Sequence, residues 1–190
     1  MSAAQHETRL SNELAFGHAR WMRDDPAVLV THVVTYLEMT TADQLRPATP
    51  APLELRPETD ASLIRPLHDR IALPHGWSGL QWSDQRWGEE LARPFLRYWV
   101  ASVEGEAVGL LALDAPPDGN YEIDIFGLVP ERVGQGLGGH FLSLAVRLAW
   151  DLGAGRVWLH TSSFDHPNAI HNYERRGFRS YRSEKRQREV

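Results

Sequence analysis

The chain has 190 residues, of which 42% are hydrophobic and 24% charged, with no cysteine and a formal net charge of -5 at pH 7. The length suits one domain, and the lack of cysteine excludes disulfides, thiolate nucleophiles and thiolate metal sites. The negative charge argues against a general nucleic-acid binder, and no window approaches the roughly 18 consecutive apolar residues of a membrane span. The first residues lack the pattern of a secretory signal, so we expect a cytoplasmic protein without nucleic-acid or membrane partners.

The N-terminal residues predict a helix and then a strand. Apolar residues at helical spacing indicate a helix over 7–23, and a β-branched run indicates a strand over 28–39. We assign both to an N-terminal extension, residues 1–50, packed on a main domain of residues 51–190. The strand is expected to join the sheet edge or to pair between the protomers of a homodimer, because exposed β-branched edges invite partners.

The main domain is predicted to begin with a strand over 53–57 and a helix that starts at Asp60 or Ser62. Pro66 lies inside this helical pattern and is expected to kink or delay the helix. A tryptophan-rich segment over 73–91 follows, and its last part predicts another helix.

Three strand-like runs come next, within 96–105, 106–119 and 120–130, and the turn signals between them predict an antiparallel meander. The pattern then changes to one apolar helical stripe over 137–152.

The C-terminal part predicts a strand over 156–161, a helix that ends at Gly177, and a last strand from Phe178. A strand–helix–strand crossover implies that the strands over 121–129 and 156–161 lie parallel. The predicted fold class is therefore mixed α/β.

Four glycines stand close together where a strand gives way to a helix: Gly134, Gly136, Gly138 and Gly139. At such a junction the first helical N–H groups lack intrahelical partners and carry a partial positive charge, so a phosphate can approach bare backbone there. A tight strand-to-helix turn is the alternative reading of the glycines alone.

Two common phosphate loops fit this junction poorly. A Walker A loop ends in Lys followed by Ser or Thr, whereas His140 and Phe141 stand here. The spacing of Gly134, Gly136 and Gly139 satisfies the dinucleotide pattern, but the expected acidic residue after the next strand is missing. A nicotinamide-dependent oxidoreductase is therefore a remote alternative.

The stretch VPERVGQGLGG resembles the acyl-CoA-binding loop of the GNAT superfamily of N-acetyltransferases. Downstream, PNAIHNYERRGF resembles the second signature of that family, and the two motifs have the right separation. The chain departs from the first motif at two positions. Glu131 stands where the family has Gln or Arg, and Val133 stands where the family often has Arg. Arg132 is expected to supply the missing positive charge from a shifted position.

The resemblance implies transfer of an acetyl group from acetyl-CoA to a primary amine by direct attack in a ternary complex. It also implies a mostly antiparallel sheet splayed between two parallel strands, with helices on both faces. The glycines would hold the pyrophosphate, and the pantetheine arm would lie along 124–129, where Gly127 is expected to form a bulge that splays the strands. The implied cofactor-binding residues are Phe126, Gly127, Leu128, Arg132, Val133, Gly134, Gln135, Gly136, Leu137, Gly138, Gly139, Asn168 and Tyr173.

Two catalytic roles follow from the resemblance. The amine must lose a proton, and Glu122 is expected to act as the base, with Asp124 or a water chain as alternatives. Tyr173 matches the general acid of the family, which protonates the leaving thiolate. The structural alternatives are an ordinary surface carboxylate pair and a tyrosine that only packs a helix on the sheet.

The acceptor side is predicted to involve Trp77, Trp82, Asp124 and His160. The acceptor itself, a small-molecule amine or a peptide, cannot be read from the sequence. No metal is expected, because the spacing of His160, His166 and His171 matches no zinc motif. The alternative function is a non-catalytic acyl-CoA sensor.

Overall fold

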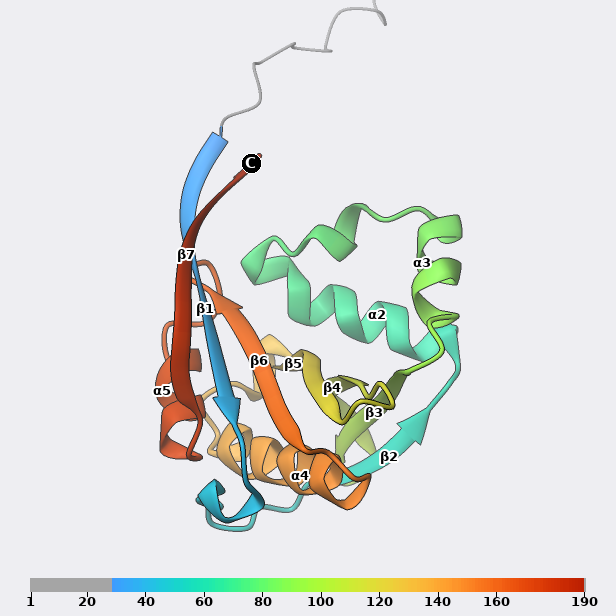
Figure 1. The fold of residues 1–190 in the computed structure, drawn as a ribbon. Coiled ribbons are helices and arrows are strands. Elements are labelled where there is room, and N and C mark those ends of the chain that lie inside the picture. Colours follow the sequence, from blue (N-terminus) through green and yellow to red (C-terminus); the bar gives the residue numbers. More distant parts are fainter. Residues whose placement is uncertain (1–28, 190) are drawn as a thin grey trace, which may run out of the picture. The chain divides into compact units, whose positions relative to one another are not determined.

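The computed structural model describes residues 29–189, and contacts divide the chain into two units, residues 1–30 with 187–190 and residues 31–186. The predicted helix over 7–23 lies outside the described residues. Seven described strands form one sheet in the order β2-β3-β4-β5-β6-β1-β7 (Figure 1). The strands are β1 (Leu29–Met39), β2 (Glu54–Glu58), β3 (Leu96–Val103), β4 (Glu106–Asp114), β5 (Asn120–Leu128), β6 (Arg156–Ser162) and β7 (Arg179–Glu189).

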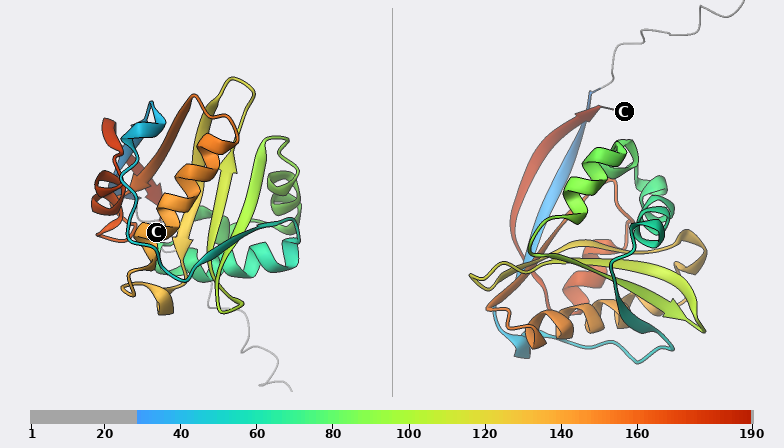
Figure 2. Two further views of the ribbon diagram at one scale, coloured as in Figure 1. Left: turned by 90° about the horizontal axis from the view of Figure 1, so that it is seen from below. Right: turned by 90° about the vertical axis from the view of Figure 1, so that its right-hand side faces the viewer.

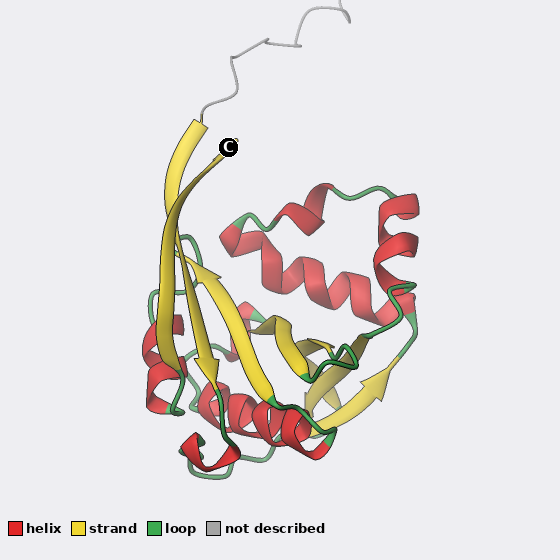
Figure 3. Cartoon of the chain, in the orientation of Figure 1, coloured by secondary structure: helices red, strands yellow, loops and turns green. Residues whose placement is uncertain are grey.

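Helices cover both faces of the sheet. α2 and α3 lie on one face and α4 on the other, with α5 beside α4 (Figures 2 and 3). β2 to β5 form an antiparallel series, whereas β5 and β6 are parallel. The described helices are α2 (Ala61–Ala72), α3 (Asp84–Leu91), α4 (Leu137–Asp151) and α5 (Ala169–Arg175), with short 3-10 turns at η2 (Ala42–Gln44), η3 (Leu73–His75), η4 (Ser78–Gln81) and η5 (Pro130–Arg132). The predicted mixed α/β fold is confirmed.

The two longest helices follow from their apolar stripes. α2 buries Ile64 and Ile71 against the sheet, and the Asp60 side chain accepts a hydrogen bond from the backbone N–H of Ser62 at its start. The predicted delay by Pro66 does not occur, since the helix begins at residue 61 and continues through it. α4 buries a stripe on the opposite face, made of Phe141, Leu142, Ala145, Val146 and Ala149.

β1 lies inside the sheet rather than at its edge, so the predicted edge position is wrong. It is flanked by β6 and β7, and it pairs with β6 in antiparallel register, with Leu37 opposite Leu159. Leu37 and Met39 are fully buried. A strand that the sequence assigned to an extension therefore contributes to the main hydrophobic core.

Candidate active site

The parallel strands β5 and β6 pair only at their beginnings. Asn120–Glu122 lie in register with Arg156–Trp158, and both strands then continue to Leu128 and Ser162 without further pairing between them in the described structure. The predicted splay of the two parallel strands is present. The result is a V-shaped split in the sheet whose apex is at Glu122.

A β-bulge at Asp124 accompanies this split. Ile125 pairs with Ala112 of β4 and Ile123 pairs with Leu113, which leaves Asp124 as the extra residue on β5. An extra residue bends the strand and reverses which side chains face each side of the sheet. β5 therefore presents acidic groups on one face before the bulge and apolar groups on the other face after it.

The predicted bulge at Gly127 is wrong, because Gly127 keeps regular register with Leu110. Glycine is required there for another reason. A Cβ at this position would lie 2.4 Å from Cγ2 of Ile71 on α2, so glycine permits the close approach of that helix. Past the bulge, Phe126 points to the α4 face, where its ring centroid lies 4.6 Å from that of Phe141.

A cavity of about 230 Å³ occupies the wide end of the split. Side chains from α2, the η3–η4 segment, β5 and α5 form its wall, and most of the exposed lining is apolar. The predicted cofactor-binding residues that line it are Phe126, Gly127, Leu128, Val133, Gly134, Gly138, Asn168 and Tyr173, and Trp77 lines it from the acceptor side. This cavity can hold an extended, mostly apolar group.

A second cavity of about 630 Å³ adjoins the first one at Gly138, Asn168 and Asn172. It lies at the N-terminus of α4, where the N–H groups of residues 136–139 lack intrahelical partners and no side chain caps the helix. The described residues that line it include no carboxylate. They include the predicted Gly136 and Gly139, and three basic residues of α5 and its end, His171, Arg175 and Arg176.

Arg176 has a buried Nε atom without a hydrogen-bond partner among the described residues. Burial and the neighbouring Arg175 lower the pKa of Arg176 from its usual value. A guanidinium group that is partly removed from water and lacks a counter-ion favours an anionic ligand. The second cavity is therefore suited to a phosphate-bearing group.

Tyr173 lies on α5 between the first cavity and the core. Its ring contacts Phe126 and Phe178 with centroid distances of 6.2 Å, and only 8% of the residue is exposed. Its hydroxyl forms no hydrogen bond with another described residue. Burial, followed by the charge of Asp165, raises the pKa of Tyr173 above its usual value, so the phenol is a neutral proton donor at the cavity.

Two hydrogen bonds join the η3–η4 segment to the loop after β6. Trp77 donates from Nε1 to Oδ1 of Asp165 at 2.9 Å, and His75 donates from Nδ1 to the carbonyl of Phe164 at 3.2 Å. The other carboxylate oxygen of Asp165 accepts from Thr161 at 2.8 Å. These bonds fix the wall of the first cavity across the split.

Three titratable groups surround the apex of the split. Nδ1 of His160 on β6 lies 3.0 Å from Oε1 of Glu122 on β5, and this hydrogen bond raises the pKa of His160. Burial, followed by the charge of Glu122, raises the pKa of Asp124 to about 6. Asp124 therefore titrates close to neutral pH, and His160 holds its proton to a higher pH than an ordinary imidazole.

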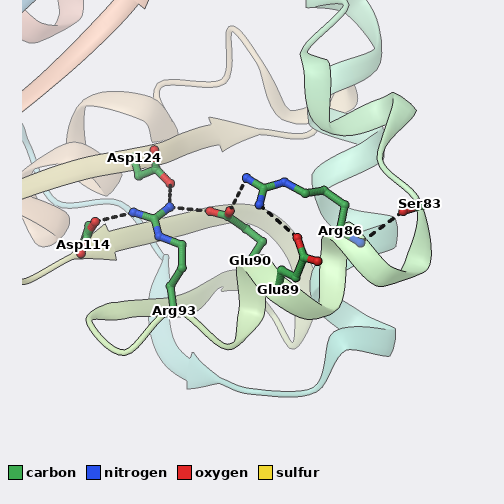
Figure 4. Close-up of polar contacts among 7 residues, drawn as sticks. All are labelled: Ser83, Arg86, Glu89, Glu90, Arg93, Asp114 and Asp124. Atoms are coloured by element: carbon green, nitrogen blue, oxygen red, sulfur yellow. Dashed lines mark hydrogen bonds and ion pairs between the residues drawn. The ribbon is translucent and has the colours of Figure 1, made fainter.

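An ion-pair network continues from Asp124 toward α3 (Figure 4). The guanidinium of Arg93 contacts Asp114 and Glu90, and its Nη1 lies 3.5 Å from Oδ2 of Asp124. The second carboxylate oxygen of Glu90 accepts from Arg86 at 3.3 Å. The face of the sheet beside the split thus carries more carboxylates than cationic groups.

Four predicted site residues point away from both cavities. Arg132 pairs with Glu106 at 2.5 Å, because the η5 turn directs it toward the start of β4. Gln135 donates to a backbone carbonyl of its own loop, Leu137 is buried in the core, and Trp82 packs on α3. In this structure the charge of Arg132 is therefore directed at Glu106 and not at either cavity.

Sequence reasoning missed the basic residues of the second cavity and the Arg93 network. The available signal for the former was the Arg-Arg pair directly before Gly177, which the helical period places near the glycine loop. No local pattern marks Arg93. Its role depends on three carboxylates that come from three separate elements.

Within residues 29–189, no group of three or more His, Asp or Glu side chains is arranged to hold a metal ion. No helix in that range is long and apolar enough to cross a membrane.

A family model described as the acetyltransferase (GNAT) family matches residues 64–178. Among solved structures, a functionally unknown conserved protein from Staphylococcus epidermidis is similar, with a TM-score of 0.61 and 16% identity over 97% of this chain and 66% of that one. A GCN5-related N-acetyltransferase from Kribbella flavida has a TM-score of 0.59 and 18% identity over 85% of this chain and 59% of that one. A GCN5-related N-acetyltransferase from Sphaerobacter thermophilus has a TM-score of 0.61 and 15% identity over 97% of this chain and 56% of that one.

The chain thus spans less than two thirds of the length of each of these three proteins, and at such identities the likeness concerns the fold. Comparison with curated protein sequences gives no match.

Proposed function

Because the chain belongs to the acetyltransferase (GNAT) family, we propose that it transfers an acetyl group from acetyl-CoA to a primary amine by direct attack in a ternary complex. The observation that carries the proposal is that the cavity in the split of the sheet adjoins the cavity at the N-terminus of α4. The first is narrow and mostly apolar, the second is wide and basic, and they meet at Gly138.

The described residues fit a coenzyme A molecule in this position. The N–H groups of residues 136–139, with Arg175 and Arg176, would hold the phosphates, since no side chain caps the helix and no carboxylate lines that cavity. The apolar walls around Phe126 and Leu128 would hold the pantetheine arm. The bound thioester would supply the activated acetyl group.

The acceptor amine must be neutral before it can attack. An alkylammonium has a pKa near 10.4, so a positioned base increases the reactive fraction at neutral pH. We assign this role to the pair of Glu122 and His160 at the apex of the split. His160 in its neutral form accepts the proton, and Glu122 orients its ring and stabilises the imidazolium that results.

Tyr173 would donate a proton to the departing sulfur. A CoA thiol resembles a free Cys thiol with a pKa of about 8.5, so protonation assists its departure. The raised pKa of Tyr173 keeps the phenol protonated at neutral pH, and its hydroxyl is not engaged by another described residue.

The test is an assay of thiol release from acetyl-CoA against a panel of amines, amino acids and peptides. The chain contains no cysteine, so a thiol reagent reports the released coenzyme without a background signal from the protein. We expect release that depends on both acetyl-CoA and an amine. Binding of CoA without turnover of any acceptor would instead indicate a sensor and would contradict the proposal.

A further inference from the structure

Carboxylates are gathered unusually closely beside the apex of the split. Asp114 of β4 lies directly opposite Glu122 of β5 in the ladder, and the bulge adds Asp124 next to them. Like charges directly opposite each other on neighbouring strands destabilise a sheet. Burial is the main cause of the raised pKa of Asp124, and the charge of Glu122 raises it further.

The cations in this region compensate only part of that charge. Arg93 is shared among Asp114, Asp124 and Glu90, and Arg86 divides its contacts between Glu89 and Glu90. His160 faces the group from β6 and contacts Glu122. The more distant Arg186 on β7 acts on His160. Four carboxylates thus share the two guanidinium groups of α3 and its end, and Glu122 pairs with His160, which is uncharged when neutral.

An independent feature points to a ligand at the same place. Tyr98 of β3 is only 5% exposed, and its hydroxyl is buried without a hydrogen-bond partner among the described residues. Tyr98 pairs with Ala112, two residues before Asp114 on β4, so the side chains of Tyr98 and Asp114 lie on the same face of the sheet. Burial, followed by the charges of Glu90 and Asp124 and opposed by Arg93, raises the pKa of Tyr98. A buried hydroxyl without a partner is costly unless a ligand or water satisfies it.

We infer that the acceptor carries a second cationic group, and that Asp114, Asp124 and Tyr98 bind it while the reacting amine lies at Glu122 and His160. This inference rests on the proposed function and names the class of acceptor: a diamine or a larger polycationic amine. Asp114 and Asp124 are about one-quarter exposed, so a ligand can reach them, and Arg93 engages a single oxygen of each. Neighbouring strands are separated by about 5 Å, which a spacer of three or four carbons between two nitrogens can cover.

The test compares putrescine with n-butylamine, two acceptors of equal carbon number that differ in the second ammonium group. In the thiol-release assay we expect kcat/KM for putrescine to exceed that for n-butylamine by at least about tenfold, as one charge-assisted contact in a partly dry site predicts. Putrescine should also raise the Tm of the protein without acetyl-CoA, whereas n-butylamine should not. Equal kcat/KM values for the two amines would overturn the inference and leave the proposed function intact. If the protein binds CoA but releases no thiol with putrescine, with n-butylamine or with any other acceptor, the proposed function is overturned and the inference with it.

Two variants locate the second cation. Tyr98→Phe removes a hydroxyl that has no protein partner, so the fold should be kept while KM for putrescine rises severalfold and that for n-butylamine stays constant. Asp114→Asn should bring the ratio of the two kcat/KM values close to one. Glu54→Gln on the outer strand β2, whose carboxylate is 69% exposed, is the matched control for loss of one negative charge and should leave the ratio unchanged. A ratio unchanged in Tyr98→Phe and Asp114→Asn would overturn the inference.

Discussion

Glu122 and His160 join the two parallel strands at the point where they separate, through a contact of 3.0 Å between Oε1 and Nδ1. Because this hydrogen bond raises the pKa of His160, the carboxylate controls the pH at which the imidazole becomes a free base. The pair is therefore both a structural tie at the apex and the expected route for the proton of the amine.

Glu122→Gln should lower kcat and move the acidic limb of the pH–rate profile to lower pH. The amide removes the charge that favours the imidazolium, and burial of His160 then lowers the pKa of His160. Since the reaction needs neutral imidazole, the increase of kcat/KM with pH should begin at a lower pH in the variant. A profile of kcat/KM against pH measures this, and an unchanged acidic limb would contradict the assignment of His160 as the base.

Tyr173→Phe should lower kcat by about 100-fold, the lower range for loss of a general acid. The affinity for CoA and the Tm should change little, because the hydroxyl makes no hydrogen bond with another described residue. Steady-state kinetics and a thermal melt together test this. A variant that lost stability instead of turnover would indicate that Tyr173 only packs α5 on the sheet.

Gly138→Ala separates binding from stability. A Cβ there would lie 3.8 Å from Leu128, so the free protein can accommodate it, and alanine in place of glycine within α4 should stabilise the fold by up to about 1 kcal/mol. The added methyl group lies where the two cavities meet, so affinity for CoA should fall. Gly88→Ala in α3 is the control, since its Cβ would contact nothing and CoA binding should be unaffected. Equal CoA affinity in both variants would place the ligand elsewhere.

Arg176→Gln should weaken CoA binding by about tenfold, as expected for one charge-assisted contact to phosphate. The guanidinium lies beside the glycine loop and has a buried nitrogen without a partner among the described residues. Arg132→Gln is the matched control, because Arg132 pairs with Glu106 outside both cavities. Calorimetric titration with CoA distinguishes the two, and a larger loss in the Arg132 variant would reverse our placement of the phosphates.

Asp124→Asn should increase the free energy of unfolding relative to the unsubstituted protein, and the increase should be larger at pH 7.5 than at pH 4. An acid whose folded pKa lies above its unfolded value contributes stability at low pH that is lost as the pH rises, here between about 4 and about 6. The amide does not ionise, so the variant avoids this loss, by an amount on the order of 1–2 kcal/mol after allowance for partial exposure. Urea melts at both pH values measure the difference, and a variant destabilised equally at both would show that the carboxylate mainly holds Arg93.

Much of the fold follows from local patterns in the sequence. The meander, the apolar stripe of α4 and the strand–helix crossover all have periodic signals, and their bounds agree with the structure to within a few residues. The position of β1 does not follow from such signals. Its β-branched run predicts a strand but carries no information on which neighbours it will have, and here those are β6 and β7.

The site was predictable in its backbone and less so in its side chains. The glycine cluster marked the loop, because bare backbone at a helix N-terminus has a recognisable sequence. The sequence predicts the bulge at Gly127, whereas the structure has it at Asp124. The glycine is needed instead because Ile71 of α2 packs too close to leave room for a side chain. The positions of long side chains depend on tertiary contacts, a charge partner for Arg132 and burial for Arg176. Such contacts cannot be read from spacing along the chain.

The most direct test of the account is a crystal structure of the protein with coenzyme A. We predict the diphosphate on the N–H groups of residues 136–139 beside Arg176, the pantetheine arm between β5 and β6, and the sulfur near the Tyr173 hydroxyl. A coenzyme bound outside the split, or one whose phosphates avoid the start of α4, would contradict it.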